Sequence, residues 1–413
     1  MHCDVAVVGA GAAGIAAAVA AAKTGADVVL VERHGFTGGL ATTALVGTIC
    51  GLYYRNPDEA RYAVHGFARE FAEAVQAKSR SKITQFAEGL HFLPYRPEAF
   101  HQIAVQQLQQ AGVHLLLRGH VTGVQVEARK ITELRIQTQS QVLNIHPATV
   151  VDCSGTAQVS LLAGIERIRE ESYQAGAFVF QVSGLPQIAP EALELELIRW
   201  IKRGIQTGGL DLWCERLSIV PGSLVQGRAL FKLGMPVLFD GSIACATQYE
   251  LDARERSAAI VDYLSRNGPL LANLSITAMA SEVGIRTGER SQGLAVLDEA
   301  HVLACAKPDD GVAIGAWPME FWGTHRKPEM RYFAMDDGYW ITAGMLVSRH
   351  LDNLFFAGRG FSATELAMAS ARVIGTCLGT GYAAGCLAAE FSKSGTWQNA
   401  IEKIRRLQMS TRS

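Results

Sequence analysis

The sequence lacks the patterns that mark several common classes of protein. It contains eight cysteines in 413 residues, but none forms a C-x-x-C motif and none has the spacing of a zinc site, so we predict no metal centre. Cysteines scattered in this way are typical of free thiols in a reducing compartment, which predicts a cytoplasmic protein. Neither sign of charge is in excess, because 38 Lys and Arg residues balance 39 Asp and Glu residues. Since nucleic-acid binding needs a concentrated basic field, we expect no nucleic-acid partner.

One uncharged run, Val5 to Ala22, is long enough to suggest a transmembrane helix. It consists mainly of Ala and Gly, which gain little free energy in lipid, and it lacks the basic segment of a signal peptide. A strand, a glycine turn and a helix explain this run better. We therefore expect no association with a membrane.

The first forty residues carry the pattern of a dinucleotide-binding fold. The run from Asp4 to Val8 predicts a buried strand, and Gly9-Ala10-Gly11-Ala12-Ala13-Gly14 follows it directly. An Ala-rich segment then predicts a helix that ends at Gly25, and a second buried strand leads to Glu32. A Gly-x-Gly-x-x-Gly turn between a strand and a helix, with an acidic residue about 20 residues further on, is typical of sites that bind dinucleotides.

Each residue type at this turn has a physical reason. Gly9 allows the tight turn, Gly11 allows a pyrophosphate to approach the backbone, and Gly14 allows the helix to pack closely. The N-terminus of the helix presents free N–H groups and the positive end of its dipole to the phosphates. Glu32 can accept hydrogen bonds from ribose hydroxyls and would repel a 2′-phosphate, which argues against NADP at this site.

Later segments extend the pattern to both ends of the chain. The pair Gly38-Gly39 follows the acidic strand end and permits unusual backbone angles and close approach to a ligand. Thr149 to Thr156 predicts a buried strand that ends in a small-residue turn, and Leu351 to Gly360 predicts another strand that enters a turn. An Ala- and Gly-rich pattern from Thr364 to Phe391 predicts one long helix.

Together these segments resemble the two-dinucleotide-binding-domain flavoproteins, in which a glycine pair follows the ribose-binding acid. The resemblance implies FAD as the ligand and a Rossmann-like α/β fold of the glutathione-reductase type, with a parallel sheet and a small antiparallel sheet. It also implies that the positive end of the last helix faces the flavin ring and stabilises its reduced, anionic form. The residues that we expect to bind FAD are Gly9, Gly11, Ala12, Ala13, Gly14, Glu32, Arg33, Gly38, Gly39, Leu40, Ala41, Thr42, Val121, Ser154, Gly155, Gly358 and Arg359.

Most of the chain resembles one family in particular, the FAD-dependent oxidoreductases with a Gly-Gly-Leu-Ala-Thr sequence after the ribose acid. The matching segments are Gly38 to Thr42, Arg286 to Arg290, Asp310 to Ala313, Ala316 to Pro318 and Asn353 to Ala371. Members often carry histidine soon after Trp-Pro, where this chain has Glu320-Phe321-Trp322, and Thr-His-Glu where it has Thr364-Glu365-Leu366. We expect both segments at the wall of the active site.

The remaining pattern predicts a mixed α+β cap inserted into the FAD-binding fold. Three predicted strands, at 113–117, 121–127 and 131–138, fit the small antiparallel sheet. We predict an FAD-binding domain over residues 1–164 and 337–413 and a substrate cap over residues 165–336. Gly379 and Gly381 lie inside the last helix pattern, where we interpret them as sites of close helix packing. No second dinucleotide motif is present, which argues against a dedicated NAD(P)H domain.

Arg286 and Glu320 are the candidate catalytic residues, because flavin performs the redox step and the protein positions the substrate and tunes charge. Arg286 could clamp a substrate carboxylate or stabilise a flavin anion, and a structural ion pair is the alternative. Glu320 could accept a proton if it is buried, and a surface or paired acid is the alternative. Cys50 has no partner cysteine at redox spacing, so we expect no catalytic dithiol. Nearby aromatic residues could line an apolar pocket or belong to the core: Phe321, Trp322, Tyr339 and Trp340.

The sequence therefore predicts an FAD-dependent dehydrogenase or oxidase that transfers a hydride from a small organic substrate to flavin. Two alternatives stay open: a flavin monooxygenase that uses external NAD(P)H, and a flavoprotein subunit that passes electrons inside a larger assembly. A homo-oligomer or a partner subunit is compatible with these hypotheses. The balanced charge argues against an FAD-dependent enzyme that modifies RNA.

Overall fold

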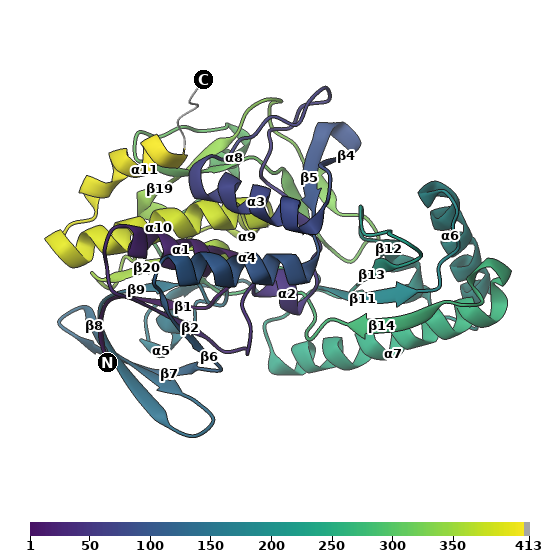
Figure 1. Ribbon diagram of the computed structural model, residues 1–413, viewed down its shortest axis with the longest axis horizontal. Coiled ribbons are helices and arrows are strands. Elements are labelled where there is room, and N and C mark those ends of the chain that lie inside the picture. The colour runs from purple at the N-terminus through teal and green to yellow at the C-terminus, as the bar shows by residue number, and fades with distance from the viewer. Residues whose placement is uncertain (409–413) are drawn as a thin grey trace.

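The structure is a computed structural model that describes residues 1–408, so that residues 409–413 of the predicted C-terminal FAD segment lie outside it. It consists of a larger body and a smaller lobe (Figure 1). A seven-stranded sheet in the order β6-β2-β1-β9-β8-β7, with β20 beside β9, forms the centre of the body. Its strands are β1 (His2–Val8), β2 (Val28–Glu32), β6 (His114–Leu117), β7 (His120–Glu127), β8 (Lys130–Gln137), β9 (Val142–Asp152) and β20 (Leu354–Phe356).

This sheet has a parallel part and an antiparallel part, which confirms the predicted Rossmann-like α/β fold. β6, β2, β1, β9 and β20 run parallel, and β7, β8 and the first residues of β9 run antiparallel. The prediction that residues 113–117 belong to the small antiparallel sheet was wrong, because β6 pairs with β2 in the parallel part. The reason is the helix α4 (Pro97–Gln110) directly before it, since a helical crossover returns the chain parallel to its neighbour.

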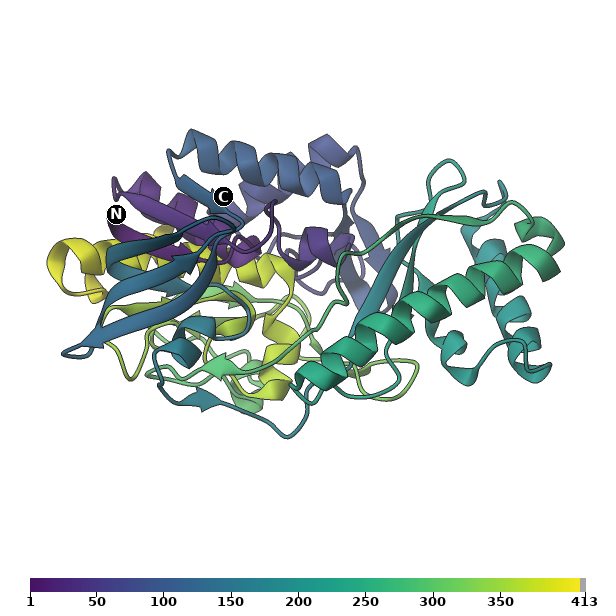
Figure 2. The ribbon, with the colours of Figure 1, turned by 90° about the horizontal axis from the view of Figure 1, so that it is seen from below.

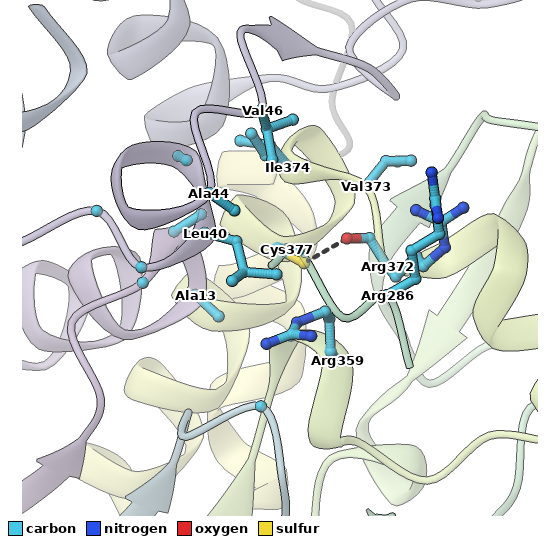
Figure 3. Close-up of a pocket in the computed structure, with 18 of the residues that line it drawn as sticks. Ala13, Leu40, Ala44, Val46, Arg286, Arg359, Arg372, Val373, Ile374 and Cys377 are labelled. Carbon is cyan, nitrogen blue, oxygen red and sulfur yellow. Dashed lines mark hydrogen bonds between the residues drawn. The ribbon is translucent and has the colours of Figure 1, made fainter. Parts of the chain in front are cut away.

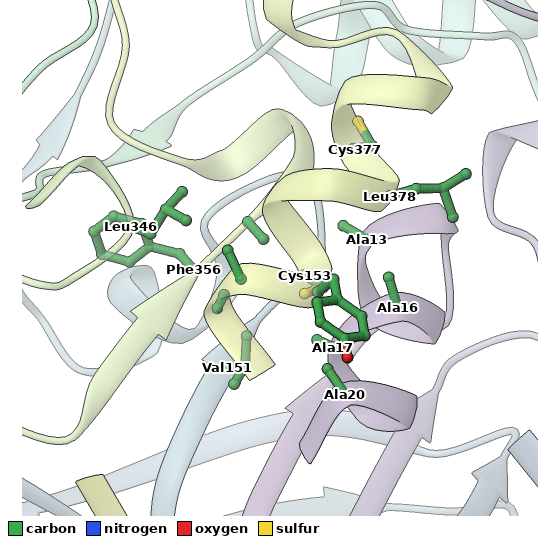
Figure 4. Packing of buried hydrophobic residues seen from close by; sticks show 14 of the residues in the cluster. Ala13, Ala16, Ala17, Ala20, Val151, Cys153, Leu346, Phe356, Cys377 and Leu378 are labelled. Atoms are coloured by element: carbon green, nitrogen blue, oxygen red, sulfur yellow. The ribbon is translucent and has the colours of Figure 1, made fainter. Parts of the chain in front are cut away.

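The helix α1 (Ala12–Lys23) follows β1 and is buried on nearly every side, from Ala13 to Ala21. Its small side chains suit this position, because α1 contacts both the sheet and the helix α10 (Ile374–Ser394). In α10, a Cβ at Gly381 would overlap with the backbone of Ala13, and a Cβ at Gly385 would overlap with the backbone of Ala17. Figure 4 shows the alanines of α1 directly beside α10. The two helices therefore approach at backbone contact, as we inferred for Gly381.

The prediction of one helix from Thr364 to Phe391 was wrong. The chain forms α9 (Glu365–Ala371) and α10, and Val373 between them is extended, with φ −69° and ψ 153°. The break is a tertiary effect, because the first turn of α10 packs on the loop at Cys50 and Gly375 donates a backbone hydrogen bond to the Cys50 carbonyl at 2.9 Å. The periodicity of the sequence cannot report such a break. The break leaves Arg372 at the junction of the two helices.

The lobe contains a four-stranded antiparallel sheet in the order β12-β13-β11-β14, and its long helix α7 crosses the lobe in Figure 2. Its elements are β11 (Ala177–Ser183), α6 (Pro190–Gln206), β12 (Leu217–Ile219), β13 (Ala229–Gly234), α7 (Ile243–Asn267) and β14 (Ser275–Met279). Alternate side chains of β11 and β13, including Phe178 and Phe231, belong to a separate core of the lobe. The side chains on the opposite face of these strands therefore point away from this core.

The core of the lobe draws its buried side chains from residues 173–283. Later elements contribute to the core of the body: α8 (Glu299–Leu303), β16 (Gly311–Gly315), β17 (Met319–Phe321) and β19 (Tyr339–Thr342). The domain boundaries near residues 164 and 336 stay predictions.

Further helices and several small sheets complete the body. They are α2 (Leu40–Thr43), β3 (Thr48–Ile49), α3 (Gly66–Ser79), β4 (Thr84–Phe86), β5 (Leu90–Pro94), α5 (Gln158–Leu162), β10 (Arg167–Ile168), β15 (Arg290–Ser291), β18 (Glu329–Arg331) and α11 (Ile401–Gln408). Within residues 1–408, no helix combines the length and the hydropathy that crossing a bilayer requires.

Candidate functional site

A cavity lies where the body meets the lobe, and its wall combines residues from both ends of the chain (Figure 3). Most of the residues predicted to bind FAD line it. They are Gly9, Gly11, Ala12, Ala13, Glu32, Arg33, Gly38, Gly39, Leu40, Ala41, Ser154, Gly155, Gly358 and Arg359. Both candidate catalytic residues, Arg286 and Glu320, line the same cavity.

Three predicted residues do not line the cavity. Gly14 lies beneath the turn, where a Cβ would overlap with the carbonyl oxygen of Gly9. The hydroxyl of Thr42 donates to the Gly39 carbonyl at 3.0 Å and so braces the glycine pair from behind. Val121 is buried within β7. We therefore place Gly14 and Thr42 as supports of the cavity wall, and FAD binding by Val121 stays a prediction.

The β1–α1 turn leaves an open space for a ligand at Gly11. Gly9 has a φ of +95°, which allows the sharp turn out of the strand. Gly11 caps the N-terminus of α1 in an extended conformation, and a Cβ built there would meet only the Gly39 Cα, at 3.9 Å. The fold itself therefore has room for a side chain at residue 11. A pyrophosphate over the free N–H groups of α1 is the ligand that would need this space.

The glycine pair closes this turn from the other side. Gly38 and Gly39 have φ values of +120° and +53°, and the Gly38 N–H donates to the Ala10 carbonyl at 2.8 Å. A Cβ at Gly39 would lie 2.9 Å from the Gly11 Cα. Both glycines are required by backbone angle and by close approach, because two backbone segments meet here.

Glu32 is held at the end of β2 by two backbone donors. Its Oε2 accepts from the Ala10 N–H at 2.7 Å, and its Oε1 accepts from the His34 N–H at 2.8 Å. Each carboxylate oxygen has capacity for a further donor such as a ribose hydroxyl. The next residue, Arg33, pairs with Glu282 of the segment after β14 at 3.0 Å, so the body and the lobe touch at this end of the cavity.

Arg359 connects the C-terminal turn to the turn after β9. Its guanidinium lies over Gly155, whose Cβ would fall 2.7 Å from the Arg359 Nη2, and its Nη1 donates to the Ile285 carbonyl. Burial lowers the pKa of Arg359 from its ordinary value. Gly358 before it has a φ of +69°. Arg359 thus presents a buried cation to the cavity between two glycine turns.

Glu320 lies in another part of the cavity wall, where two tryptophan side chains donate hydrogen bonds to its carboxylate. The indole N–H of Trp317 donates to Glu320 Oε2 at 3.1 Å, and the indole N–H of Trp322 donates to Glu320 Oε1 at 3.0 Å. Arg372 Nη2 lies 3.8 Å from Glu320 Oε2 and donates to the Glu320 carbonyl at 3.1 Å. Glu320 is therefore a positioned, paired carboxylate, which favours the structural alternative over a free general base.

Lys232 and Arg286 complete this wall. The Lys232 Nζ lies 4.8 Å and the Arg286 Cζ lies 4.6 Å from the centroid of the Trp322 ring. Burial, followed by the charge of Arg286, lowers the pKa of Lys232 to about 8. Burial, followed by the charge of Arg372, lowers the pKa of Arg286 to about 9. In Figure 3 Arg286 and Arg372 lie side by side at the edge of the cavity.

Most of the other polar and aromatic residues named from the sequence lie behind this wall. Arg290 is fully buried and pairs with Glu365 at 2.8 Å and Glu170 at 2.9 Å, so it has the structural role that we considered for Arg286. Glu365 does not line the cavity, although we expected its segment there. Cys50 lines the cavity, but burial raises its pKa to about 12, which keeps the thiol protonated. Of the four aromatic residues, only Trp322 lines the cavity.

Sequence reasoning missed Lys232, Arg372 and Trp317. Lys232 is the one charged residue in the apolar strand β13, and a lone charge in a buried strand is a usable signal. Arg372 follows the last segment that we matched to the family, but no helix break was predicted there. Trp317 was matched to the family without being assigned to the site. Only the tertiary structure brings these residues to one wall.

Comparisons with known proteins agree with this geometry. The sequence matches the family model described as FAD dependent oxidoreductase over residues 4–410. The chain belongs to the FAD-dependent oxidoreductase family. This match confirms FAD as the cofactor and oxidoreduction as the class of reaction, as the resemblance implied. A search of curated proteins gave no match.

The solved structure of one flavin-dependent enzyme shares the fold of this FAD-dependent oxidoreductase, and other solved structures resemble it over most of the chain. The flavin-dependent brominase Bmp2 has a TM-score of 0.51 at 12% identity, covering 98% of this chain and 83% of that chain. A geranylgeranyl bacteriochlorophyll reductase-like protein from Thermoplasma acidophilum has a TM-score of 0.49 at 12% identity, with the same coverage. L-proline dehydrogenase from P. horikoshii has a TM-score of 0.45 at 12% identity and covers 95% of this chain and 94% of that chain. At these identities the likeness concerns the fold alone.

Proposed function

We propose that the protein oxidises a small organic substrate by hydride transfer to FAD, with the lobe of residues 173–283 as the substrate cap. The observation that carries the proposal is one cavity that joins the dinucleotide turn at Gly11 to a polar wall formed by Lys232, Arg286, Glu320 and Arg372. A site that only stored FAD as a structural group would have no need of a charged compartment beyond the cofactor.

In this proposal each part of the wall has a separate task. The N-terminus of α1 and Gly11 receive the pyrophosphate, Glu32 receives the ribose, and Arg359 lies beside the part of FAD nearest the C-terminal turn. When bound, FAD supplies the acceptor for a hydride. The face of β11 and β13 that carries Val179 and Lys232, which are opposite one another in register, covers the cavity and limits the access of water.

The visible spectrum of the purified protein tests the proposal, followed by anaerobic titration with candidate reductants. We expect flavin absorbance, release of FAD on denaturation, and bleaching by an organic substrate without NAD(P)H. Rapid bleaching by NADPH, with no response to organic reductants, would instead identify the monooxygenase alternative. Turnover only with a co-purifying stoichiometric partner would identify the electron-transfer subunit.

A further inference from the structure

The polar wall beside Trp322 carries more positive than negative charge. Three cations line it, Lys232, Arg286 and Arg372, and Glu320 is the carboxylate among them. The carboxylate oxygens of Glu320 already accept from two indole N–H groups, and Arg372 is the cation that pairs with it, at 3.8 Å. Two of the three cations are thus left without a carboxylate.

Lys232 has no acceptor of its own. Within residues 1–408, its ammonium makes no hydrogen bond and has no carboxylate within 4.0 Å, and its contact is the face of the Trp322 ring. Arg286 also has no carboxylate partner in the described chain. It gives one N–H to the Ala175 carbonyl and lies against the same ring, so most of its guanidinium donors are free.

Two cations in a partly desolvated cavity with no carboxylate within 4.0 Å in residues 1–408 are unfavourable, because burial penalises the charged form. The lowered pKa values of both groups express this cost. If these cations had a structural role, we would expect the chain to supply a carboxylate partner, as it supplies Glu365 and Glu170 to Arg290 behind the wall. The contrast with Arg290 indicates that the partner of Lys232 and Arg286 comes from outside the chain.

The position of Lys232 favours a substrate as that partner. Lys232 belongs to β13 of the lobe, opposite Val179 in β11, and Arg286 follows β14 of the same lobe. By contrast Arg359, which lies between the glycine turns of the body, is placed toward the cofactor. Lys232 from the cap and Arg286 from the segment that follows β14 are therefore placed to bind a substrate that enters the cavity after FAD has bound.

We propose that Lys232 and Arg286 bind the carboxylate of an anionic substrate, which makes the substrate a small acid oxidised at a carbon that bears a hydroxyl or an amine. This inference rests on the proposed function. In the reaction the substrate C–H bond breaks with transfer of a hydride to flavin, the hydroxyl or amine loses one proton to solvent, and a C=O or C=N bond forms. The carboxylate is unchanged and serves as the anchor.

Titration of the purified protein with benzoate tests this assignment, with benzamide as the neutral probe of the same shape, at constant ionic strength. Flavin absorbance reports binding beside the ring, and tryptophan fluorescence gives a second readout that does not depend on flavin. The variants are Lys232→Met and Arg286→Met. Lys82→Met is the control, because Lys82 is exposed and does not line the cavity. Acetate and acetamide form a second pair, in case the cavity excludes a ring.

We expect each carboxylate to bind at least tenfold more tightly than its amide, and each cavity variant to lose at least tenfold in affinity while Lys82→Met retains it. The charge-conserving variants Lys232→Arg and Arg286→Lys are expected to restore most of the binding, which separates a charge effect from misfolding. Equal binding of acid and amide would overturn the assignment. So would unchanged carboxylate affinity in the Met variants with a shifted flavin potential, because the cations would then serve the flavin. Carboxylate binding without bleaching by any organic reductant would contradict the proposed function and leave this site intact.

Discussion

The guanidinium of Arg359 occupies the space that a side chain at Gly155 would fill, with the Arg359 Nη2 2.7 Å from the position of that Cβ. Two turns 204 residues apart in the chain (residues 155 and 359) pack closely against each other in this way. The contact also reaches the segment that follows the lobe, because Arg359 donates to the Ile285 carbonyl.

Gly155→Ala is therefore expected to displace Arg359 and to weaken FAD binding at least tenfold, which is about 1.4 kcal/mol. Gly164→Ala is the matched control, since Gly164 has a similar positive φ of +67° against +77° for Gly155 but open space around it. Both variants share the backbone strain of a non-glycine residue at positive φ, about 1 kcal/mol. Equal FAD affinity in the two variants, measured by fluorescence titration of the apoprotein, would show that Arg359 does not contribute.

Gly11→Val is expected to abolish retention of FAD and to leave the apoprotein folded. The extended backbone of Gly11 suits valine, and the nearest atom to a new Cβ is 3.9 Å away, so we expect the added side chain to intrude on the predicted pyrophosphate site and not on the backbone around it. Flavin content per protein and the melting temperature of the apoprotein measure the two effects. A variant with normal flavin content would refute the pyrophosphate assignment.

Glu32→Ala is expected to weaken FAD binding by about 1–3 kcal/mol, the loss typical of hydrogen bonds to a charged group. Glu32→Gln helps to separate the causes. It keeps one carbonyl oxygen for the backbone donors at Ala10 and His34 but removes the charge. We expect the Gln variant to show an intermediate dissociation constant. An unchanged constant in both variants would exclude Glu32 from the ribose site.

Gly385→Ala is expected to destabilise the fold by about 1–3 kcal/mol, because its Cβ would overlap with the backbone of Ala17 and force α10 away from α1. In the same helix, a Cβ at Gly379 would make ordinary contacts at 3.6 Å with Ala313 and Gln408. Gly379→Ala should therefore be neutral or stabilise by up to about 1 kcal/mol, through the higher helix propensity of alanine. Denaturant unfolding of both variants measures the difference, and equal stabilities would contradict the close helix contact.

Carboxylate binding is expected to weaken as the pH rises through about 8, because the pKa of Lys232 is lowered to about 8 and only the protonated ammonium attracts an anion. The other charged groups at this wall are Arg286, Glu320 and Arg372, and Cys50 stays protonated since its pKa is raised to about 12. Benzoate titrations from pH 6 to about pH 10 measure the effect. The decline near pH 8 should be absent in Lys232→Arg, in which only a later decline near pH 9 remains, from Arg286. An unchanged decline near pH 8 in that variant would assign it to another group.

The family, the cofactor and the nucleotide end of the site could be predicted from the sequence because they depend on local chain geometry. The strand, the glycines at residues 9–14 and Glu32 lie within one βαβ unit, so their spacing along the chain fixes their spacing in the fold. The strands around this unit were predicted for the same reason, since periodicity reports burial of one face. The single helix predicted over residues 364–391 failed because the break at Arg372 is imposed by the loop at Cys50, which is distant in sequence.

The sequence by itself determined the glycine turn at residues 9–14 and predicted FAD as its ligand, because glycine and acidic residues at fixed spacing leave few other conformations and few other ligands. Only the tertiary structure decided how charge is distributed around the cavity. It paired Glu320 with Trp317, Trp322 and Arg372, paired Arg290 behind the wall, and left Lys232 and Arg286 without a carboxylate partner in residues 1–408. Such pairings depend on side chains that come from separate strands and loops, and no spacing along the chain encodes which of them meet.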